Sequence, residues 1–281
     1  MDRWRDIISD PLNQLIERHP LAGHVNNDRF VRLHNGLFAG YDEHNSYYGN
    51  FSDILVINRG VHEPLEEFIF QALIKENLTR ENLVILELGS YWGHYSMWFL
   101  NSLKHASAIL VEPDAMHIEV GKRNFRYNNL AAEHINDFVS SERLRIDDFL
   151  CNKQIPNLFL LHSDIQGYEV EMLENAQASL LSQSIEHLFV STHSDELHLR
   201  CLKILLQYNY RIDVQSNVSE HTTSYDGLIV ASKPNSPPLL TGLYPLGRRE
   251  IANATARQII EYLWSALERI DKDQTLKPLK I

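Results

Sequence analysis

The sequence predicts an α/β fold in which seven strands form a doubly wound, mostly parallel sheet with one antiparallel strand. Short apolar runs, such as residues 84–88, are typical of strands buried on both faces of a parallel sheet, and amphipathic segments alternate with these runs along the chain. The last two runs, residues 210–215 and 225–231, follow each other without a helix between them. They therefore predict a terminal hairpin that contains the antiparallel strand.

An N-terminal extension is expected over residues 1–60. It begins with a short helix at residues 5–18 and continues into a stretch rich in Gly, Asn, His and Tyr at residues 34–51. Flexible glycines with aromatic and hydrogen-bonding groups suit a lid that folds over a substrate, and they equally suit a surface loop with packed tyrosines. A helix is then expected at residues 63–75, with Pro64 at a favourable first-turn position, and it should cover the edge of the strand that follows.

The main domain is expected to span residues 61–235. Its strands are predicted at residues 84–88, 108–111, 134–139, 158–163, 185–191, 210–215 and 225–231, and its clearest helices at residues 170–181 and 197–208. Asp147 and Asp148 lie between the third and fourth strands and are assigned to a loop. The alternation places helices on both faces of the sheet.

The C-terminal part, residues 236–281, is expected to hold a linker and a long amphipathic helix. Residues 251–270 place apolar side chains on one helical face, namely Ala252, Ala256, Ile259, Ile260, Leu263, Leu267 and Ile270. This stripe either packs back onto the sheet or forms a subunit contact. The second alternative predicts a homodimer.

The first strand of the main domain leads into a turn with two glycines four residues apart, Gly89 and Gly93. The next strand ends at Glu112, about 20 residues further on. An acidic side chain at this place can accept the hydroxyl protons of a ribose, as in nucleotide-binding folds. A ribose-bearing cofactor is therefore expected.

Two residues of the turn indicate which cofactor it is. Tyr91 stands where a dinucleotide fingerprint needs a second glycine for close approach to a pyrophosphate. Glu87 would repel a pyrophosphate but would attract the ammonium and sulfonium charges of S-adenosylmethionine. The turn therefore favours S-adenosylmethionine and disfavours a dehydrogenase.

Four separated pieces of the sequence resemble one family. They are Glu87-Leu88-Gly89-Ser90-Tyr91-Trp92-Gly93-His94-Tyr95-Ser96, Val111-Glu112-Pro113-Asp114, the block from Leu160 to Leu173, and Ser191-Thr192-His193-Ser194 with the later Asp226-Gly227-Leu228-Ile229-Val230. In these pieces, which span roughly residues 60–235, the chain is similar to the FkbM-type S-adenosylmethionine-dependent methyltransferases. The resemblance implies a class I, Rossmann-like methyltransferase fold.

The resemblance also implies which residues bind the cofactor. The expected cofactor-binding residues are Glu87, Gly89, Ser90, Tyr91, Gly93, His94, Ser96, Glu112 and Pro113. The chain departs from the family pattern at His162, where the family has a lysine, and at Gln166, where it has a glutamate. Glu169 corresponds to the final acid of the same block, and as the first residue of a helix it also suits a capping role.

The chemistry is expected at the carboxyl ends of the strands, where open α/β sheets bind ligands. Asp164 follows the fourth strand and His193 follows the fifth. Methyl transfer to a hydroxyl requires alignment and removal of a proton, so we expect His193 to act as the base, and Asp164 to orient it or to accept the proton itself. A variant of this hypothesis places a divalent cation such as Mg²⁺ on Asp164 and His193, with Asp195 or His162 as a further ligand.

The expected function is O-methylation of a hydroxyl on a small molecule, a sugar or glycan, or a secondary metabolite. The alternative is a non-catalytic binding or scaffold protein that retains the fold, and the departures at His162 and Gln166 raise it. The net charge of −11, without clustered Lys and Arg, argues against a nucleic-acid partner.

The sequence also predicts a location. Apolar runs are too short for a membrane span, and the N-terminus lacks the pattern of a signal peptide. Cys151 and Cys201 are the two cysteines, so no disulfide framework is expected. These features favour a cytoplasmic protein.

Overall fold

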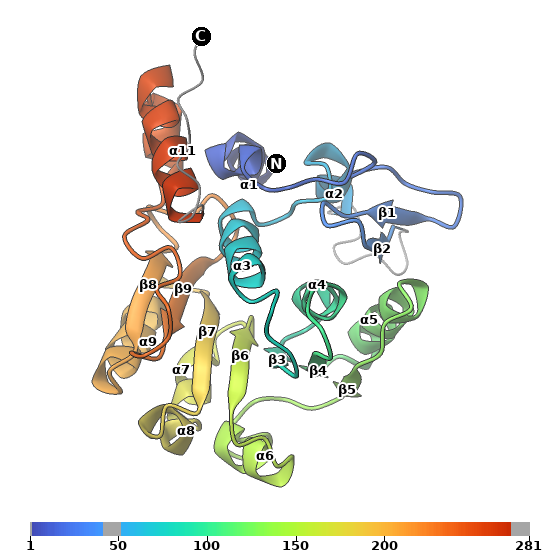
Figure 1. Cartoon of the computed structure of the whole chain (residues 1–281), viewed down its shortest axis with the longest axis vertical. Coiled ribbons are helices and arrows are strands. Elements are labelled where there is room, and N and C mark those ends of the chain that lie inside the picture. The colour runs from blue at the N-terminus through green and yellow to red at the C-terminus, as the bar shows by residue number, and fades with distance from the viewer. Residues whose placement is uncertain (1, 42–51, 271–281) are drawn as a thin grey trace.

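The computed structural model describes residues 2–41 and 52–270, and within them seven strands form one sheet in the order β5-β4-β3-β6-β7-β9-β8 (Figure 1). Their bounds are Val84–Leu88 for β3, Ser107–Val111 for β4, Glu133–Ile135 for β5, Leu158–Ser163 for β6, Ile185–Thr192 for β7, Arg211–Ser216 for β8 and Gly227–Ser232 for β9. β9 runs antiparallel to both of its neighbours, β7 and β8, and the other pairs are parallel. The structure confirms the predicted fold class, including the single antiparallel strand.

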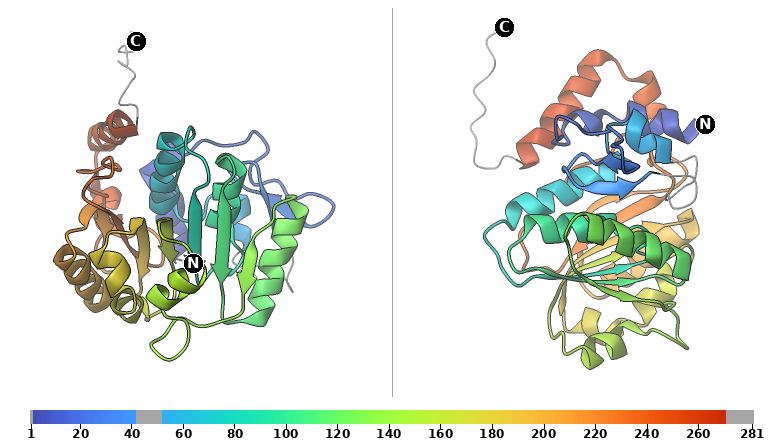
Figure 2. Two further views of the ribbon diagram at one scale, coloured as in Figure 1. Left: turned by 60° about the horizontal axis from the view of Figure 1, so that its bottom comes forward. Right: turned by 90° about the vertical axis from the view of Figure 1, so that its right-hand side faces the viewer.

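Helices cover both faces of this sheet (Figures 1 and 2). One face carries α3 (Pro64–Glu76), α4 (His94–Ser102) and α5 (Ala115–Tyr127), and the other carries α6 (Ile146–Asn152), α7 (Glu169–Glu174), α8 (Gln177–Leu181) and α9 (Asp195–Gln207). Successive strand residues point to opposite faces, so Ile85 packs into the first hydrophobic cluster and Leu86 into the second. Both are fully buried, which explains why this strand is apolar without interruption.

The N-terminal segment packs against the face that carries α3. It contains α1 (Asp2–Ser9), the 3₁₀ helix η1 (Pro11–Gln14), the two-stranded pair β1 (Phe30–Arg32) and β2 (Phe38–Gly40), and α2 (Asp53–Ile57). The predicted helix at residues 5–18 is wrong in extent, because Asp10 interrupts it and caps η1 through the backbone N–H of Leu12 at 2.8 Å. Residues 42–51 of the proposed lid lie outside the described residues.

The helix α3 covers a face of the sheet and no strand edge, contrary to the prediction, because β3 lies between β4 and β6. Asp147 and Asp148 were also misplaced, since they lie in the first turn of α6 and not in a loop. The Asp147 carboxylate accepts hydrogen bonds from the backbone N–H groups of Ala178 and Ser179. It thereby caps α8, which is why the helix predicted at residues 170–181 is divided into α7 and α8.

The C-terminal helix is also divided, into α10 (Arg248–Asn253) and α11 (Ala256–Ile270), because Ala254 is extended between them. Ala266 is the buried residue of α11, and Tyr262 packs beside it on the first hydrophobic cluster. This helix lies against η1 at the N-terminal segment, so it packs back onto the protein body without covering the sheet (Figure 1). Ile260 and Trp264 stay exposed, and the homodimer stays a prediction.

Within residues 2–41 and 52–270, no helix has both the length and the apolar character needed to cross a lipid bilayer.

Candidate active site

The turn between β3 and α4 depends on two glycines in the left-handed region. Gly89 has φ +69°, and a Cβ atom there would come within 1.8 Å of the Asp164 carbonyl oxygen. Gly93 has φ +77°, and a Cβ atom there would come within 2.6 Å of the Phe125 ring. Tyr91 lies between them with φ +39°, an uncommon conformation for a bulky residue. The glycines therefore let the turn fit tightly between the end of β6 and α5.

A cavity of about 400 Å³ opens beside this turn, at the carboxyl ends of β3, β4 and β6. Four of the predicted cofactor-binding residues line it, namely Gly89, Tyr91, Glu112 and Pro113. The sequence analysis missed further lining residues, which include Asp137, Phe138, Ile165 and Tyr168. Asp137 and Phe138 were missed because the strand predicted at residues 134–139 ends at Ile135, so both side chains belong to the loop at the mouth of the cavity.

Glu112 connects the end of β4 to the turn. Its Oε2 accepts a hydrogen bond from the backbone N–H of Tyr91 at 3.1 Å. Its Oε1 lies 3.0 Å from the backbone nitrogen of Asp114 and 3.3 Å from Nδ1 of His117. The carboxylate is 5% exposed and lines the cavity, so these donors hold it in a fixed position for a ligand.

The other predicted cofactor residues lie deeper. Glu87 is buried and accepts a hydrogen bond from the backbone N–H of Ser96 at 3.0 Å, and burial raises the pKa of its carboxyl group. Glu87, Ser90 and His94 line a second, small cavity of about 20 Å³. Ser96 and Gly93 shape the turn through the backbone. Asp164 lines both cavities, so it lies at their junction.

The two predicted catalytic residues come together with a third, Asp226. Thr192 pairs with Gly227 across β7 and β9, so His193 and Asp226 lie one residue beyond this pair at the same edge of the sheet. His193 Nε2 lies 3.2 Å from Asp164 Oδ1 and 3.4 Å from Asp226 Oδ1. Its other nitrogen, Nδ1, donates to Glu169 Oε1 at 2.5 Å. One imidazole therefore contacts three carboxylates.

These carboxylates determine the protonation of the cluster. Burial lowers the pKa of His193, but the hydrogen bonds to Asp164 and Glu169 and the charge of Asp226 outweigh it and raise the pKa to about 10. Burial and the charge of Asp164 raise the pKa of Asp226 to about 8. His193 is therefore a cation at neutral pH, and Asp226 loses its proton only slightly above neutral pH.

Three other residues named from the sequence have different surroundings. His162 Nε2 lies 2.8 Å from Glu66 Oε1 of α3, so an acid from a distant helix accompanies the histidine that departs from the family pattern. Asp195 accepts hydrogen bonds from the backbone N–H groups of Val218 and Ser219 and thereby holds the loop before β9. Glu169 is fully buried and orients the His193 ring, in addition to its place at the start of α7.

Polar side chains surround a further small cavity next to Asp226. Its lining includes Glu63, Glu66, Ser191, Thr222, Thr223 and Ser224. Ser224 donates to Glu63 at 2.9 Å, so the loop before β9 contacts the residue that precedes α3. No local pattern pointed to Glu63 and Glu66, because only the fold brings α3 to the ends of β6 and β7.

Comparison with solved structures gives low sequence identities. TrmK of M. capricolum, solved with S-adenosyl-homocysteine, is 18% identical with a TM-score of 0.42, over 74% of this chain and 89% of that chain. A precorrin-6y C5,15-methyltransferase from Geobacter metallireducens GS-15 is 11% identical with a TM-score of 0.42, over 58% and 87%. The METTL16 methyltransferase domain is 12% identical with a TM-score of 0.45, over 62% and 67%.

No curated protein sequence matches the chain at a significant level. A sequence model of the methyltransferase FkbM domain, in contrast, matches residues 45–212, which is more than half of the chain and includes the turn between β3 and α4, Glu112, Asp164 and His193. The resemblance found in the separated sequence pieces is therefore confirmed over a continuous region. The chain belongs to the FkbM family of S-adenosylmethionine-dependent methyltransferases.

Proposed function

We propose that the protein transfers a methyl group to a hydroxyl of a small molecule, a sugar or glycan, or a secondary metabolite. One observation carries this proposal: Asp164 lines both the large cavity beside the cofactor turn and the small cavity behind it, and it contacts His193. The cluster of Asp164, His193 and Asp226 therefore borders the cavity that would hold the methyl donor.

The residues of the large cavity fit S-adenosylmethionine. The volume of about 400 Å³ falls in the range of pockets for molecules of this size. Glu112 presents a fixed carboxylate for ribose hydroxyls, and the aromatic ring of Phe138 together with Ile165 offers apolar contact for a base. When bound, the cofactor supplies an electrophilic methyl group on a positively charged sulfur. The buried acid Glu87 lies toward the small cavity and favours positive charge there.

The cluster around His193 supplies the proton chemistry. Because His193 is already protonated at neutral pH, we propose that Asp226, with a pKa of about 8, accepts the proton of the acceptor hydroxyl. The His193 imidazolium lies against both Asp226 and Asp164 and stabilises the ionised carboxylates. Glu169 keeps the imidazole in place through Nδ1. This assignment retains Asp164 and His193 in the site and changes the role that was expected for His193.

Charge near the site favours a neutral or cationic acceptor. Glu63 and Glu66 line the cavity next to Asp226, and Asp164 lies close by. An anionic acceptor such as a nucleic acid would be repelled by these carboxylates, whereas hydroxyl groups can donate to them. The acidic surroundings thus support a polyhydroxylated small molecule or glycan.

A divalent cation is an alternative occupant of the same cluster. Asp164, His193 and Asp226 each offer one ligand atom, and these atoms lie within 4.8 Å of one another. We propose the cation-free form, because the imidazolium already contacts both carboxylates. Turnover should then be unchanged by EDTA and by added Mg²⁺, and a loss of turnover with EDTA that Mg²⁺ restores would instead assign the cation.

The decisive experiment separates the enzyme from a scaffold that retains the fold. S-adenosylhomocysteine should raise the thermal unfolding temperature by mass action on the folded state, and NAD should leave it unchanged. Labelled S-adenosylmethionine should then transfer its label to a hydroxylated acceptor from a panel of sugars and phenols, and not to matched amines. If the protein binds the cofactor but transfers no label to any hydroxylated acceptor or to any component of a host extract, the scaffold alternative is favoured. Transfer of the label to amines alone would refute O-methylation.

A further inference from the structure

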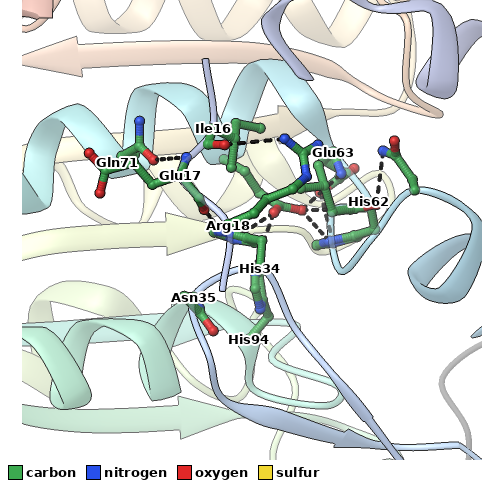
Figure 3. A network of polar contacts seen from close by, with 12 residues as sticks. Ile16, Glu17, Arg18, His34, Asn35, His62, Glu63, Gln71 and His94 are labelled. Carbon is green, nitrogen blue, oxygen red and sulfur yellow. Dashed lines mark hydrogen bonds and ion pairs between the residues drawn. The ribbon is translucent and has the colours of Figure 1, made fainter. Parts of the chain in front are cut away.

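A second group of titratable side chains lies on the other side of the cofactor turn and takes no part in the proposed reaction. His34 comes from the N-terminal segment, His62 precedes α3, Glu67 lies in α3, and His94 is the first residue of α4. Figure 3 shows that the side chains of His34, His62 and Glu63 meet in one network. His34 is 1% exposed, Glu67 0% and His94 2%, so the group is buried, and His94 also borders the small cavity behind the turn.

The distances within the group match the first coordination sphere of a metal ion. Glu67 Oε2 lies 2.8 Å from His34 Nε2 and 3.7 Å from His94 Nε2. One ligand atom from each of these three residues lies within 4.8 Å of the others. Ligands bound tetrahedrally to zinc at about 2.0–2.1 Å are separated from each other by about 3.3 Å. The two observed distances fall on either side of that value.

The buried polar atoms of this group face one another. In the described part of the chain, His94 Nδ1 and Nε2, His34 Nε2 and Glu67 Oε2 make no hydrogen bond of regular geometry. His34 Nδ1 lies 3.3 Å from the carbonyl oxygen of Glu17, and this contact turns Nε2 toward Glu67. His34 Nε2 and Glu67 Oε2 are 2.8 Å apart, so both can contact one ion.

His62 contacts the same carboxylate from its other oxygen. His62 Nδ1 lies 2.6 Å from Glu67 Oε1. This contact occupies one oxygen of Glu67 and leaves Oε2 facing His34 and His94.

We propose that His34, Glu67 and His94 bind a divalent transition-metal ion, with zinc as the best match to two imidazole nitrogens and one carboxylate. His62 orients Glu67 from the opposite oxygen, and the His34 N–H to the Glu17 carbonyl is the outer contact that fixes the ring of a metal-binding histidine. The Trp92 ring stacks on His94 with 4.8 Å between ring centres and shields it from water.

The position of this site gives the ion a structural role. It would connect the N-terminal segment through His34 and α3 through Glu67 to His94, which directly follows Gly93 of the cofactor turn. The three segments are far apart in the sequence, so one ion would restrain the turn from two sides. This site is separate from the cluster around His193 and does not depend on methyl transfer.

The metal content of the purified protein tests the site. The full chain, expressed without a histidine tag in zinc-supplemented medium, should contain about one zinc per chain by inductively coupled plasma mass spectrometry. His94→Gln and His34→Gln should each lower this content at least tenfold. His24→Gln, which changes an exposed histidine of the same N-terminal segment, should keep it, and so should Asp226→Asn, which alters the other cluster.

A measurement on the unmodified chain covers the case in which the variants do not fold. Protein from cobalt-supplemented, zinc-depleted medium should show the visible absorption bands of tetrahedral Co²⁺, and zinc should abolish them. Unmodified protein that contains no transition metal and gives no cobalt bands would overturn the proposal. Full metal content in folded His94→Gln together with folded His34→Gln would overturn it as well.

Discussion

Asp226 Oδ1 lies 3.4 Å from His193 Nε2, although Asp226 directly precedes a strand and His193 directly follows one. This contact arises because β9 runs antiparallel to β7, so the start of one strand and the end of the other share an edge. The imidazolium lies between Asp226 and Asp164, and this arrangement determines how activity and stability should depend on pH.

The rate of methyl transfer should rise with pH through about 8, because protonated Asp226 cannot accept a proton. Asp226→Asn should lower kcat by about 10²-fold or more and should remove this rise, while the affinity for S-adenosylhomocysteine stays the same. A pH–rate profile of both proteins checks this. An unchanged profile in the variant would show that Asp226 is not the group that titrates.

The same substitution should stabilise the fold. Since the pKa of Asp226 rises from 3.8 in the unfolded chain to about 8 in the folded protein, the folded state holds a proton that the unfolded state has released between these pH values. Stability of the unmodified protein therefore falls, relative to Asp226→Asn, as pH rises from about 4 to about 8. The unfolding temperature of Asp226→Asn should exceed that of the unmodified protein by more at pH 8 than at pH 5. Equal unfolding temperatures at both pH values would contradict the raised pKa.

His193→Gln separates two roles of this residue. If the imidazolium stabilises the carboxylates, its loss should lower kcat by about 10²-fold and shift the rise of the pH profile to higher pH, because Asp164 and Asp226 then repel each other without compensation. If His193 were itself the base, the rise would disappear. His193→Ala with a normal rate of transfer would exclude either role. Calorimetric titration with S-adenosylhomocysteine is the control for cofactor binding.

Glu112→Gln should weaken binding of S-adenosylhomocysteine by about 10- to 100-fold, because it replaces a charged acceptor of ribose hydroxyls and weakens the hold on the Tyr91 backbone. Glu119→Gln is the matched control, since Glu119 lies exposed in α5, where it pairs with Lys122 at 2.9 Å, away from the cavity lining. Affinities from calorimetric titration compare the two. Equal affinities would mean that Glu112 does not contact the cofactor.

Gly89→Ala should destabilise the protein strongly, because the added Cβ atom meets the Asp164 carbonyl oxygen at 1.8 Å and the φ angle is positive. Gly36→Ala shares the positive φ but meets no atom closer than 3.5 Å, so it should cost only about 1–2 kcal/mol. The difference between the two free energies of unfolding in urea isolates the close approach. Two equal losses would show that the turn can move away from β6.

The sequence predicted the elements whose signals are local. Every strand of the seven-stranded sheet overlaps a predicted strand, and Glu112 and the glycines were identified from their spacing. The ends of strands have weaker signals. Because β5 was predicted to continue beyond Ile135, Asp137 and Phe138 were not recognised as residues that line the large cavity.

Contacts between distant segments could not be predicted in this way. Glu66 comes to His162 and Glu67 to His34 only after α3 packs on the sheet, and no spacing rule connects these residues. Asp226 was noted as part of the closing strands, but its place beside His193 depends on the antiparallel pairing of Thr192 with Gly227. The chemistry was thus missed where tertiary structure alone creates it.

Because β9 runs in the reverse direction, different parts of the structure hold the two ends of the loop that precedes it. The loop before β9 ends at the same edge of the sheet as Asp164, and Asp195 anchors its first part through Val218 and Ser219. Asp226, at its other end, is placed by the strand pairing and not by the loop. A segment exchanged between these two anchors should therefore leave Asp226 beside His193.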